Sequence, residues 1–291
     1  MFTPITGPYL VPFEQQDSPT TFNTQPPANM PGKKACKAAL AEETERLDEL
    51  QRKLYAEDRR SLLLIFQAID AAGKDSTIRA VMKGVNPAGC QVYSFKQPSK
   101  EELDHDFLWR TTRCLPERGR IGIFNRSHYE ETLVVRVHPE YLQAQRIDIP
   151  DDLETLWQQR FEAIRNYEKH LANNGTVIVK FWLNVSRDEQ RRRFLSRLDE
   201  AEKNWKFAVS DMQERRHWDA YMHAYSETLA ATSRPWAPWY AIPADDKSYM
   251  RWQVAKLVRK TLERMEPHYP EVDATVAERF AEMRRYLKRE P

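Results

Sequence analysis

Cysteine is scarce in this 291-residue chain, and its distribution excludes several kinds of site. The three cysteines, Cys36, Cys90 and Cys114, are odd in number and widely spaced, so no CxxC pair is present to hold a metal or form a redox disulfide. The histidines likewise show no metal-binding spacing such as H-E-x-x-H. We therefore expect a protein of a reducing compartment, the cytoplasm, without a metal centre built on Cys or His.

Long apolar runs and a large net charge are also missing. The longest apolar runs, such as Leu62–Phe66 with its flanks, are far too short to span a bilayer, and the chain does not start with a positive segment followed by an apolar one. The net charge is only +2 although 30% of the residues are charged, which argues against a dedicated nucleic-acid binder. We expect a soluble, unexported protein that binds neither membranes nor nucleic acid, so any anionic partner must meet a local basic patch.

The chain divides into an arm and one large domain. Residues 1–35 are rich in Pro, Thr, Asn and Gln without a sustained period, which predicts an extended N-terminal arm that drapes over a neighbouring subunit. Residues 36–291 are expected to form a single domain. From Cys36 to Arg60, apolar residues recur at helical spacing among many charges, which is typical of an amphipathic helix with one buried stripe.

An alternation of apolar strands and longer helical patterns then predicts the fold class. The expected strands lie near 61–69, 90–95, 120–125, 176–184 and 238–243. The expected helices lie near 74–84, 100–113, 128–137, 152–173, 186–201, 209–231, 246–266 and 273–288. Strands that are apolar on both faces and linked by helices belong to a parallel sheet covered on both sides, so we expect a three-layer α/β domain with a five-stranded parallel sheet.

The segment Asp70–Thr77, which directly follows the first strand, indicates a phosphate-binding loop (P-loop). Its Gly73 lets backbone N–H groups approach phosphate oxygens, the start of the next helix contributes its positive dipole end, and Lys74 supplies a point charge. The match to G-x-x-x-x-G-K-[ST] is imperfect, since Ala68 replaces the first glycine and Asp75 replaces the metal-binding hydroxyl. A carboxylate at Asp70 or Asp75 can hold Mg²⁺ between itself and the phosphates. An ordinary capped turn is the alternative interpretation of this segment.

The next polar constellation, Asn125–Glu131, follows the buried strand at Ile121–Phe124. Ligand crevices in open α/β sheets lie beyond the carboxyl ends of the strands, so this tip should face Lys74. Arg126 is then a candidate phosphate ligand, with a surface ion pair as the alternative. Glu130 has less support, because a carboxylate in the first turn of a helix is also favoured by the helix dipole.

A third segment, Ser186–Arg197, begins with an N-cap pattern and continues as a highly basic helix. Arg193 and Arg197 share one face of this helix, and Lys203 and Lys206 follow closely. Such helices act as lids over phosphates in small P-loop kinases, and we place the lid at about residues 187–210. A solvated helix face is the alternative for some of these arginines.

Taken together, these blocks resemble the polyphosphate kinase 2 family from about residue 36 to 265. Further matching segments are Gly84–Pro87, Ser94–Ser99, Phe107–Arg110, Leu115–Gly119, Asn204–Phe207 and Ala237–Lys247. The resemblance implies a P-loop kinase fold similar to thymidylate kinase with a helical lid. It also implies Mg²⁺-dependent transfer of the terminal phosphoryl group of polyphosphate to a nucleotide, with Mn²⁺ as a substitute metal. The form Asn125–Glu131 looks like the branch that phosphorylates both AMP and ADP; related branches carry aspartate at the position of Asn125 and asparagine at that of Glu130.

The candidate site residues follow from the motifs and the resemblance combined. As catalytic residues we take Asp70, Lys74, Arg126 and Glu130, with Asp70 also as the metal ligand. As phosphate- or nucleotide-binding residues we take Ala71, Ala72, Gly73, Asp75, Ser76, Asn86, Lys96, Arg118, Asn125, Arg136, Arg193, Arg197 and Lys206. The uncovered arm and the apolar final helix favour a homo-oligomer, either a dimer or a tetramer.

Two alternatives to this function remain open at the level of sequence. An ATP-dependent nucleoside or nucleotide kinase would share the fold and the phosphate loop and differ only in its donor. A non-catalytic nucleotide-binding protein is suggested by the departures at Ala68 and Asp75, and it would show no turnover at any Mg²⁺ concentration.

Overall fold

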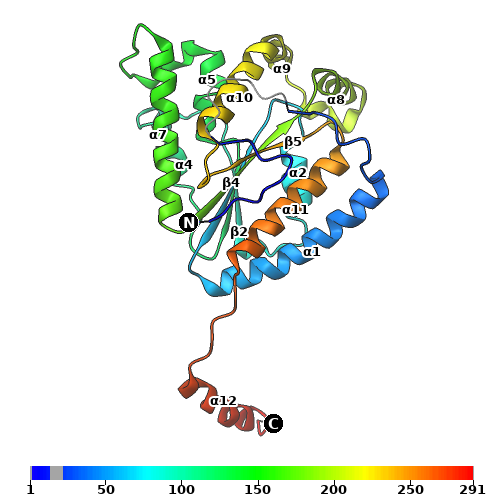
Figure 1. Ribbon diagram of the computed structural model, residues 1–291, viewed down its shortest axis with the longest axis vertical. Coiled ribbons are helices and arrows are strands. Elements are labelled where there is room, and N and C mark those ends of the chain that lie inside the picture. The colour runs from blue at the N-terminus through cyan, green and yellow to red at the C-terminus, as the bar shows by residue number, and fades with distance from the viewer. Residues whose placement is uncertain (1, 14–21, 291) are drawn as a thin grey trace.

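The computed structural model describes residues 2–13 and 22–290. Its core is a five-stranded parallel sheet with the order β2-β3-β1-β4-β5 (Figure 1). The strands are β1 (Ser61–Gln67), β2 (Cys90–Ser94), β3 (Ile121–Asn125), β4 (Thr176–Asn184) and β5 (Trp239–Pro243). The α/β class and the five parallel strands are therefore confirmed, while the strand order is new information.

The helices alternate with these strands along the chain. The longer ones are α1 (Lys33–Glu57), α2 (Lys74–Val81), α7 (Leu153–Asn173), α8 (Arg187–Asp199), α10 (Trp218–Thr232), α11 (Lys247–Met265) and α12 (Ala274–Leu287). The short ones are η1 (Pro87–Gly89), α3 (Lys100–Leu103), α4 (Trp109–Thr112), η2 (His128–Glu131), α5 (Val134–Val137), η3 (Pro139–Tyr141), α6 (Leu142–Gln145), η4 (Ala201–Lys206), α9 (Val209–Glu214) and η5 (Arg215–His217). None of the helices in the described residues is long and apolar enough to cross a membrane.

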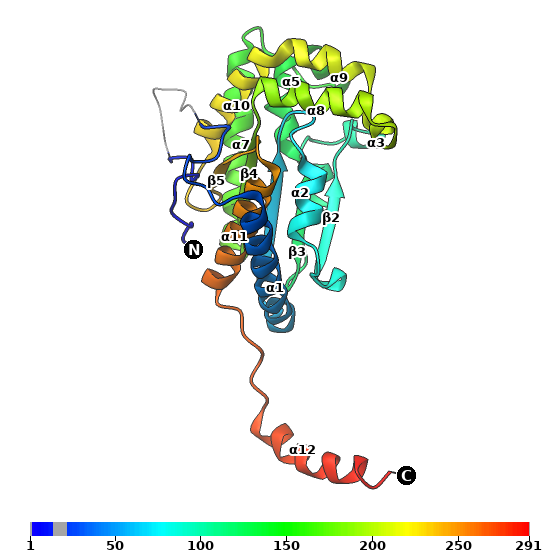
Figure 2. The ribbon, with the colours of Figure 1, turned by 90° about the vertical axis from the view of Figure 1, so that its right-hand side faces the viewer.

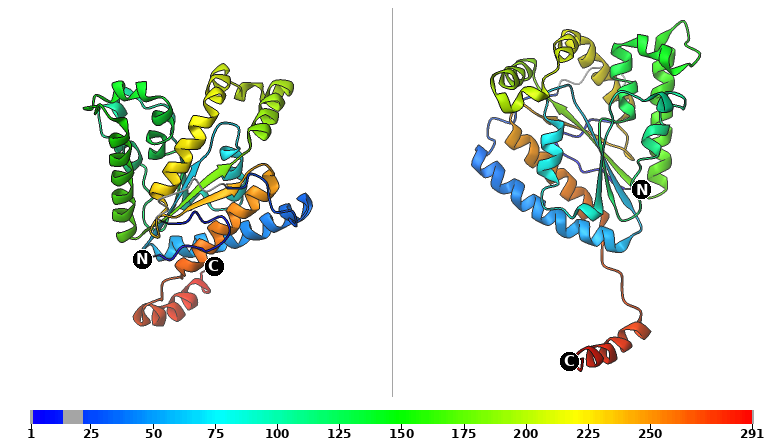
Figure 3. Two further views of the ribbon diagram at one scale, coloured as in Figure 1. Left: turned by 45° about the horizontal axis from the view of Figure 1, so that its top comes forward. Right: turned by 180° about the vertical axis from the view of Figure 1, so that it is seen from behind.

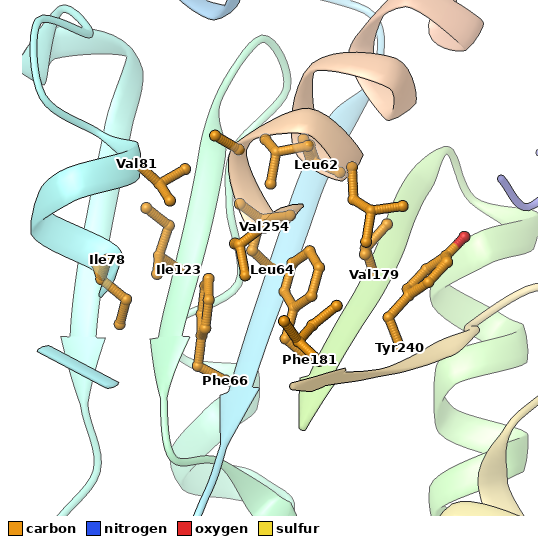
Figure 4. Close-up of a cluster of buried hydrophobic side chains, with 14 of the residues drawn as sticks. Leu62, Leu64, Phe66, Ile78, Val81, Ile123, Val179, Phe181, Tyr240 and Val254 are labelled. Atoms are coloured by element: carbon orange, nitrogen blue, oxygen red, sulfur yellow. The ribbon is translucent and has the colours of Figure 1, made fainter. Parts of the chain in front are cut away.

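Strand β1 is the central strand of the sheet, and every one of its residues is therefore buried. Its side chains alternate between the two faces, as the pleat of a strand requires. Leu62, Leu64 and Phe66 face the layer formed by α1, α2 and α11, and Figure 4 shows them between the side chains of the neighbouring strands. Leu63 and Ile65 face the other layer, which contains α7 and α10. The left view of Figure 3 shows the sheet between these two layers.

Several predicted elements have different limits. The first strand ends at Gln67 rather than 69, because the chain turns there into the loop before α2. The first helix ends at Glu57, since Asp58 adopts the left-handed region with φ of 50°. The predicted helix 100–113 is two short helices; between them, Asp106 accepts a hydrogen bond from the backbone N–H of Leu108, a local turn that competes with the helix.

Two further predicted helices are also interrupted. The segment 128–137 begins as the 3₁₀ helix η2, in which Ser127 caps the N–H of Tyr129, and only then becomes α5. The segment 209–231 is broken by η5 between α9 and α10. Both breaks lie beside the cavity described below, and the helical periodicity of the sequence does not predict them.

The described part of the N-terminal arm packs against its own domain, and contact of the arm with a neighbouring subunit stays a prediction. The N–H of Val11 donates to the carbonyl of Trp239 at 2.9 Å, and the N–H of Ala241 donates to the carbonyl of Tyr9 at 2.8 Å. These bonds satisfy the free edge of β5, which would otherwise offer unpaired backbone groups to another chain. Residues 1 and 14–21 of the predicted arm lie outside the described residues, and the boundary at residue 35 stays a prediction.

Candidate active site

The loop after β1 has the backbone shape of a phosphate-binding loop. Gly73 adopts φ of 106° and Ala71 adopts φ of 62°, both in the left-handed region, and helix α2 begins at the next residue, Lys74. This shape directs the first N–H groups of α2 out of the carboxyl end of the sheet. Ala68 at the start of the loop is buried and needs no positive φ, so the missing first glycine does not distort the loop.

Lys74 lies inside this loop and not on the surface. Only 9% of the residue is exposed, and its Nζ donates to the carbonyl of Ala68 at 2.5 Å. Burial, reinforced by the nearby cation Arg126, lowers the pKa of Lys74 to about 8, and the carboxylates of Asp70 and Glu130 oppose that shift. A bound phosphate would add negative charge beside the ammonium and favour its charged form.

Arg126 connects the tip of β3 to the loop after β1. Its Nη2 donates to Oδ1 of Asp70 at 2.9 Å, and its Nη1 lies 3.5 Å from Oε2 of Glu130. The Glu130 carboxylate is the main cause that raises the pKa of Arg126, with Asp70 adding to it. The side chain remains 36% exposed, so part of the guanidinium faces the solvent-filled space above the sheet.

Glu130 is fixed from two sides. Nε2 of Gln67, the last residue of β1, donates to its Oε1 at 3.0 Å, and Arg126 lies at its other oxygen. Burial raises the pKa of Glu130, while Arg126 and Lys74 pull it in the opposite direction. The four candidate catalytic residues Asp70, Lys74, Arg126 and Glu130 are thus brought together at the carboxyl end of the sheet, as the sequence predicted.

Three of these four residues line a cavity of about 470 Å³. Asp70, Arg126 and Glu130 line it, and so does Lys96, which follows β2. Arg215 of η5 and Tyr221 and Tyr225 of α10 also line it. A cavity of this size that combines charged and aromatic side chains suits a nucleotide-sized ligand.

Asp75 lies at the rim of the loop and is held by β3. Nδ2 of Asn125 donates to Oδ1 of Asp75, and the same Nδ2 lies 3.4 Å from Oγ of Ser94. Within the described residues, no three His, Cys, Asp or Glu side chains gather as a ready-made metal cage. The carboxylates at the loop nevertheless fit Mg²⁺, which is commonly held by one or two carboxylates together with substrate phosphates and water. Asp70 and Asp75 are the available carboxylates.

The basic helix α8 is fastened to the loop by Arg193. Its guanidinium donates to the backbone carbonyls of Ala71 at 3.1 Å, Ala72 at 2.5 Å and Ala244 at 2.5 Å, and only 7% of the residue is exposed. Gln190, one turn earlier, donates to the carbonyl of Asp70 at 3.0 Å. The prediction of a helix over the phosphate loop is thus matched in position, but Arg193 acts as a brace because its Nη groups donate to backbone carbonyls and its Nε donates to Glu189 at 2.8 Å.

The other predicted cations of the lid point elsewhere. Arg197 donates to Asp211 of α9 and to the carbonyl of Lys206, both at 3.2 Å. The Lys206 ammonium lies over the exposed ring of Trp205, 5.0 Å from its centroid.

Two other candidate residues, Gly73 and Ser76, lie in the phosphate loop and in the first turn of α2, where the Ser76 hydroxyl donates to the carbonyl of Gly73 at 3.0 Å.

Three further candidate residues contact neither the phosphate loop nor the cavity. Asn86 caps η1 just before β2, and Arg118 lies close to Gly175 just before β4, so both lie at the amino end of the parallel sheet. Arg136 forms ion pairs with Glu154 at 3.0 Å and Glu227 at 2.6 Å, between α7 and α10. These placements correct the prediction that the three residues bind phosphate or nucleotide. Asn86 and Arg118 lie at the amino end of the sheet and cannot reach the loop, and Arg136 holds α7 and α10 together through its two ion pairs.

Sequence reasoning missed several residues that shape the site. Gln67, Gln190, Arg215 and Tyr225 all contact the loop, its partners or the cavity. Of these residues, only Gln67 could have been identified from the sequence, since it is the one amide in a mostly apolar strand. Arg215 is positioned by bonds to the carbonyl of Arg187 and to Gln190, which only the folded chain brings together.

A parallel sheet with a phosphate loop at its carboxyl end, facing an arginine on the neighbouring strand, defines a P-loop phosphotransferase. Comparison with known proteins specifies the family. The model of the polyphosphate kinase 2 (PPK2) family matches residues 30–270, so the chain belongs to that family and is an enzyme of the polyphosphate kinase kind.

Individual relatives agree with this assignment. An ADP-polyphosphate phosphotransferase of Rhodopseudomonas palustris is 54% identical over 85% of this chain and 86% of its own length. An AMP/ADP-polyphosphate phosphotransferase of Meiothermus ruber is 46% identical over 82% of this chain and 86% of its own. The crystal structure of polyphosphate kinase 2 from Arthrobacter aurescens superimposes with a TM-score of 0.81 at 39% identity, covering 92% of this chain and 90% of that one. The predicted P-loop kinase fold is confirmed.

Proposed function

We propose that this chain, a polyphosphate-dependent nucleotide phosphotransferase by its family, accepts both AMP and ADP and converts them to ADP and ATP. The observation that carries the proposal is that Arg126 and Asp70 line the 470 Å³ cavity while the buried Lys74 interacts electrostatically with both of them from the adjoining loop. Two cations and a carboxylate at the carboxyl end of a parallel sheet are suited to phosphates that carry a metal ion.

The nucleotide is proposed to occupy the cavity between the loop and α10. The rings of Tyr221 and Tyr225 offer an apolar surface for a base or ribose, while Arg126 and Lys96 offer charge to its phosphates. Glu130 is held by Gln67 and Arg126 in a wall of the same cavity, where it can orient the acceptor. The name of the Meiothermus ruber relative, which includes both AMP and ADP, supports a dual acceptor range.

The polyphosphate donor is proposed to lie along a second group of cations, on α2, α8, η4 and α11. Burial lowers the pKa of Lys247, and the neighbouring cations Arg193 and Arg251 lower it further. Burial also lowers the pKa of Arg251, with Arg79 and Arg193 adding to the effect. Nε of Arg251 is buried and has no hydrogen-bond partner in the described part of the chain. Clustered cations without enough counter-charge form a favourable site for a polyanion.

Transfer requires little covalent chemistry from the protein. The bridging P–O bond to the terminal phosphoryl group of polyphosphate breaks, a new P–O bond forms to a phosphate oxygen of the nucleotide, and the shortened polyphosphate leaves. The attacking oxygen is already ionised at neutral pH, so no general base is needed. Lys74 and Arg126 stabilise the charge that spreads over the transferred group, and the loop excludes water behind it.

Mg²⁺, or Mn²⁺ in its place, is proposed to accompany the phosphates. When bound, the ion neutralises phosphate charge and helps to align the donor and the acceptor. Asp70 would hold it, with Asp75 available through water; Arg126 keeps Asp70 oriented in the meantime. Removal of the metal with a chelator should abolish turnover, and re-addition of Mg²⁺ or Mn²⁺ should restore it.

A product assay tests the function directly. The purified chain is incubated with Mg²⁺, polyphosphate and either AMP or ADP, without ATP, and the nucleotides are separated by ion exchange. We expect ATP from ADP, and ADP followed by ATP from AMP. Product from ADP alone would disprove the dual acceptor range. Product only after ATP is added would favour an ATP-dependent kinase, and no turnover at any Mg²⁺ concentration would favour a non-catalytic nucleotide-binding protein.

A matched pair of variants tests the donor path. Arg251→Ala should raise KM for polyphosphate about ten-fold and leave KM for ADP unchanged, since one charge-assisted contact is worth roughly 1.5 kcal/mol or more. Arg52→Ala, an exposed arginine of α1 paired with Asp48, serves as the control for loss of charge. Equal values for the two variants would place the donor elsewhere.

A further inference from the structure

The final helix, α12, carries an apolar stripe that nothing in the described chain covers. Figure 2 shows α12 well separated from the body of the protein, and every residue from 268 to 290 is exposed. The exposed apolar side chains are Val272, Val276, Phe280, Met283, Tyr286 and Leu287, with exposed fractions from 46% to 64%. The match to the family model ends at residue 270, so the family assignment says nothing about this helix.

The spacing of the stripe indicates a helix-pairing seam. Val276, Phe280, Met283 and Leu287 follow one another in steps of four, three and four residues. Such steps are the d-a-d-a pattern of a heptad repeat, which places all four side chains on one face for packing against a second helix. A solvated helix would not need to keep its large apolar residues on one side.

The charges along α12 change sign from one end to the other. Glu271, Asp273, Glu278 and Glu282 stand in the first part, with Arg279 as its one base. Arg284, Arg285, Lys288 and Arg289 stand in the last part, with Glu290 as its one acid. A helix of this kind is complementary to a reversed copy of itself, because each acidic half then lies beside a basic half. The opposed helix dipoles contribute in the same direction.

We propose that α12 pairs with α12 of a second copy of this chain in an antiparallel arrangement about a two-fold axis. The residues that flank the seam decide between the two orientations. In a parallel pair, position g of one helix faces position e of the other, which would set Arg279 against Arg284 of the second copy on both sides. In the antiparallel pair, Arg279 lies beside Tyr286 of the second copy and no like charges meet. Such an isologous contact is closed and self-complementary.

Mixed disulfide cross-linking tests the orientation in the full-length chain. In the antiparallel pair, Phe280 of one copy faces Met283 of the other, so a mixture of Phe280→Cys and Met283→Cys chains should form more covalent dimer under mild oxidation than either variant alone. More dimer from a single variant alone would indicate the parallel pair and overturn the proposal. No dimer above that of the wild-type chain, which retains Cys36, Cys90 and Cys114, would also overturn it.

Sedimentation measures how far the pairing drives assembly. The double variant Phe280→Asp/Met283→Asp should lower the mass of the largest assembly or raise its dissociation constant at least ten-fold. Ala274→Asp/Ala281→Asp, which adds the same two charges outside the seam of α12, should change neither. Equal assembly of the double variant and the wild-type chain would refute a role for the seam. Circular dichroism and thermal melting verify that both variants keep the folded domain, from which α12 is separate.

Discussion

Arg126 donates a hydrogen bond to Asp70 at 2.9 Å and thereby joins the tip of β3 to the loop that follows β1. The two residues are 56 positions apart in the chain and directly follow neighbouring strands of the sheet. Arg126 itself adopts the left-handed region, with φ of 63°, a conformation that arginine occupies only when its surroundings impose it. The contact therefore presents two oppositely charged groups, in fixed orientation, to any phosphate and metal that enter the cavity.

Substitutions at this pair should reduce catalysis more than stability. Asp70→Asn and Arg126→Lys should each lower kcat by roughly 10²–10³, because the lost contacts stabilise charge that develops in the transition state. Lysine cannot replace the planar, two-pronged contact of arginine with phosphate. Steady-state kinetics with ADP and polyphosphate provides the measurement, and unfolding curves serve as the control. A rate within two-fold of wild type for Arg126→Lys would assign Arg126 a structural role only.

The brace at Arg193 predicts a different outcome from that of a phosphate ligand. Arg193→Ala should destabilise the fold by about 2–4 kcal/mol, because it removes several buried charge-assisted bonds to backbone carbonyls. Arg191→Ala is the matched control, since the side chain of Arg191 is 64% exposed and its ion pair is with Asp188. Chemical denaturation compares the two variants. Equal stability would show that the bonds of Arg193 do not hold the loop.

The buried lysine of the loop predicts a pH dependence. The pKa of Lys74 is about 8 in the substrate-free chain, so its positive charge is present below that pH and is lost as the pH rises through it. We therefore expect kcat/KM to fall above about pH 8, while kcat falls only at higher pH because bound phosphate favours the ammonium. The Lys74→Arg variant keeps the positive charge at every accessible pH. Its kcat/KM should therefore not fall above pH 8, whatever the absolute rate of the variant. An identical fall in Lys74→Arg would exclude Lys74 as its cause.

A buried ion pair beneath the site should matter for stability. Lys180 of β4 and Glu168 of α7 lie 2.7 Å apart and are almost fully inaccessible, and Tyr129 bonds to both. Lys180→Met should cost about 3–5 kcal/mol because it leaves the Glu168 carboxylate buried without its partner. Lys180→Met/Glu168→Gln should recover a large part of that loss in urea unfolding. A double variant as unstable as the single one would show that packing, and not charge, dominates here.

The fold could be predicted to a large extent because its signals are local. Apolar runs such as Leu62–Phe66, each followed by a helical period, indicate a parallel sheet without any knowledge of long-range contacts. The same holds for the loop, since a strand, Gly73-Lys74 and a helix are contiguous in the chain. The interruptions inside the segments 100–113, 128–137 and 209–231 could not be predicted, because side-chain caps and tertiary contacts override helical propensity there.

The candidate site was predicted in part for the same reason. Residues at the carboxyl ends of strands, such as Asp70 and Arg126, must meet in a parallel sheet. Asn86 and Arg118 belong to equally suggestive segments, yet they precede their strands and lie at the opposite end of the sheet. Arg193 shows a further limit: its position on a basic helix favours a phosphate ligand, while its actual partners are Glu189 on the same helix and backbone carbonyls of two distant loops.

The sequence by itself determined the class of this protein, the loop that faces phosphate and the family to which it belongs, because these depend on contiguous patterns of residues. Only the tertiary structure decided which charges share the cavity, which arginines are committed to the framework and where the arm lies against β5. The physical reason is that the energy of a charge depends on its surroundings. A guanidinium in solvent, one beside Asp70 and one surrounded by carbonyls are the same residue in the sequence and three different groups in the fold.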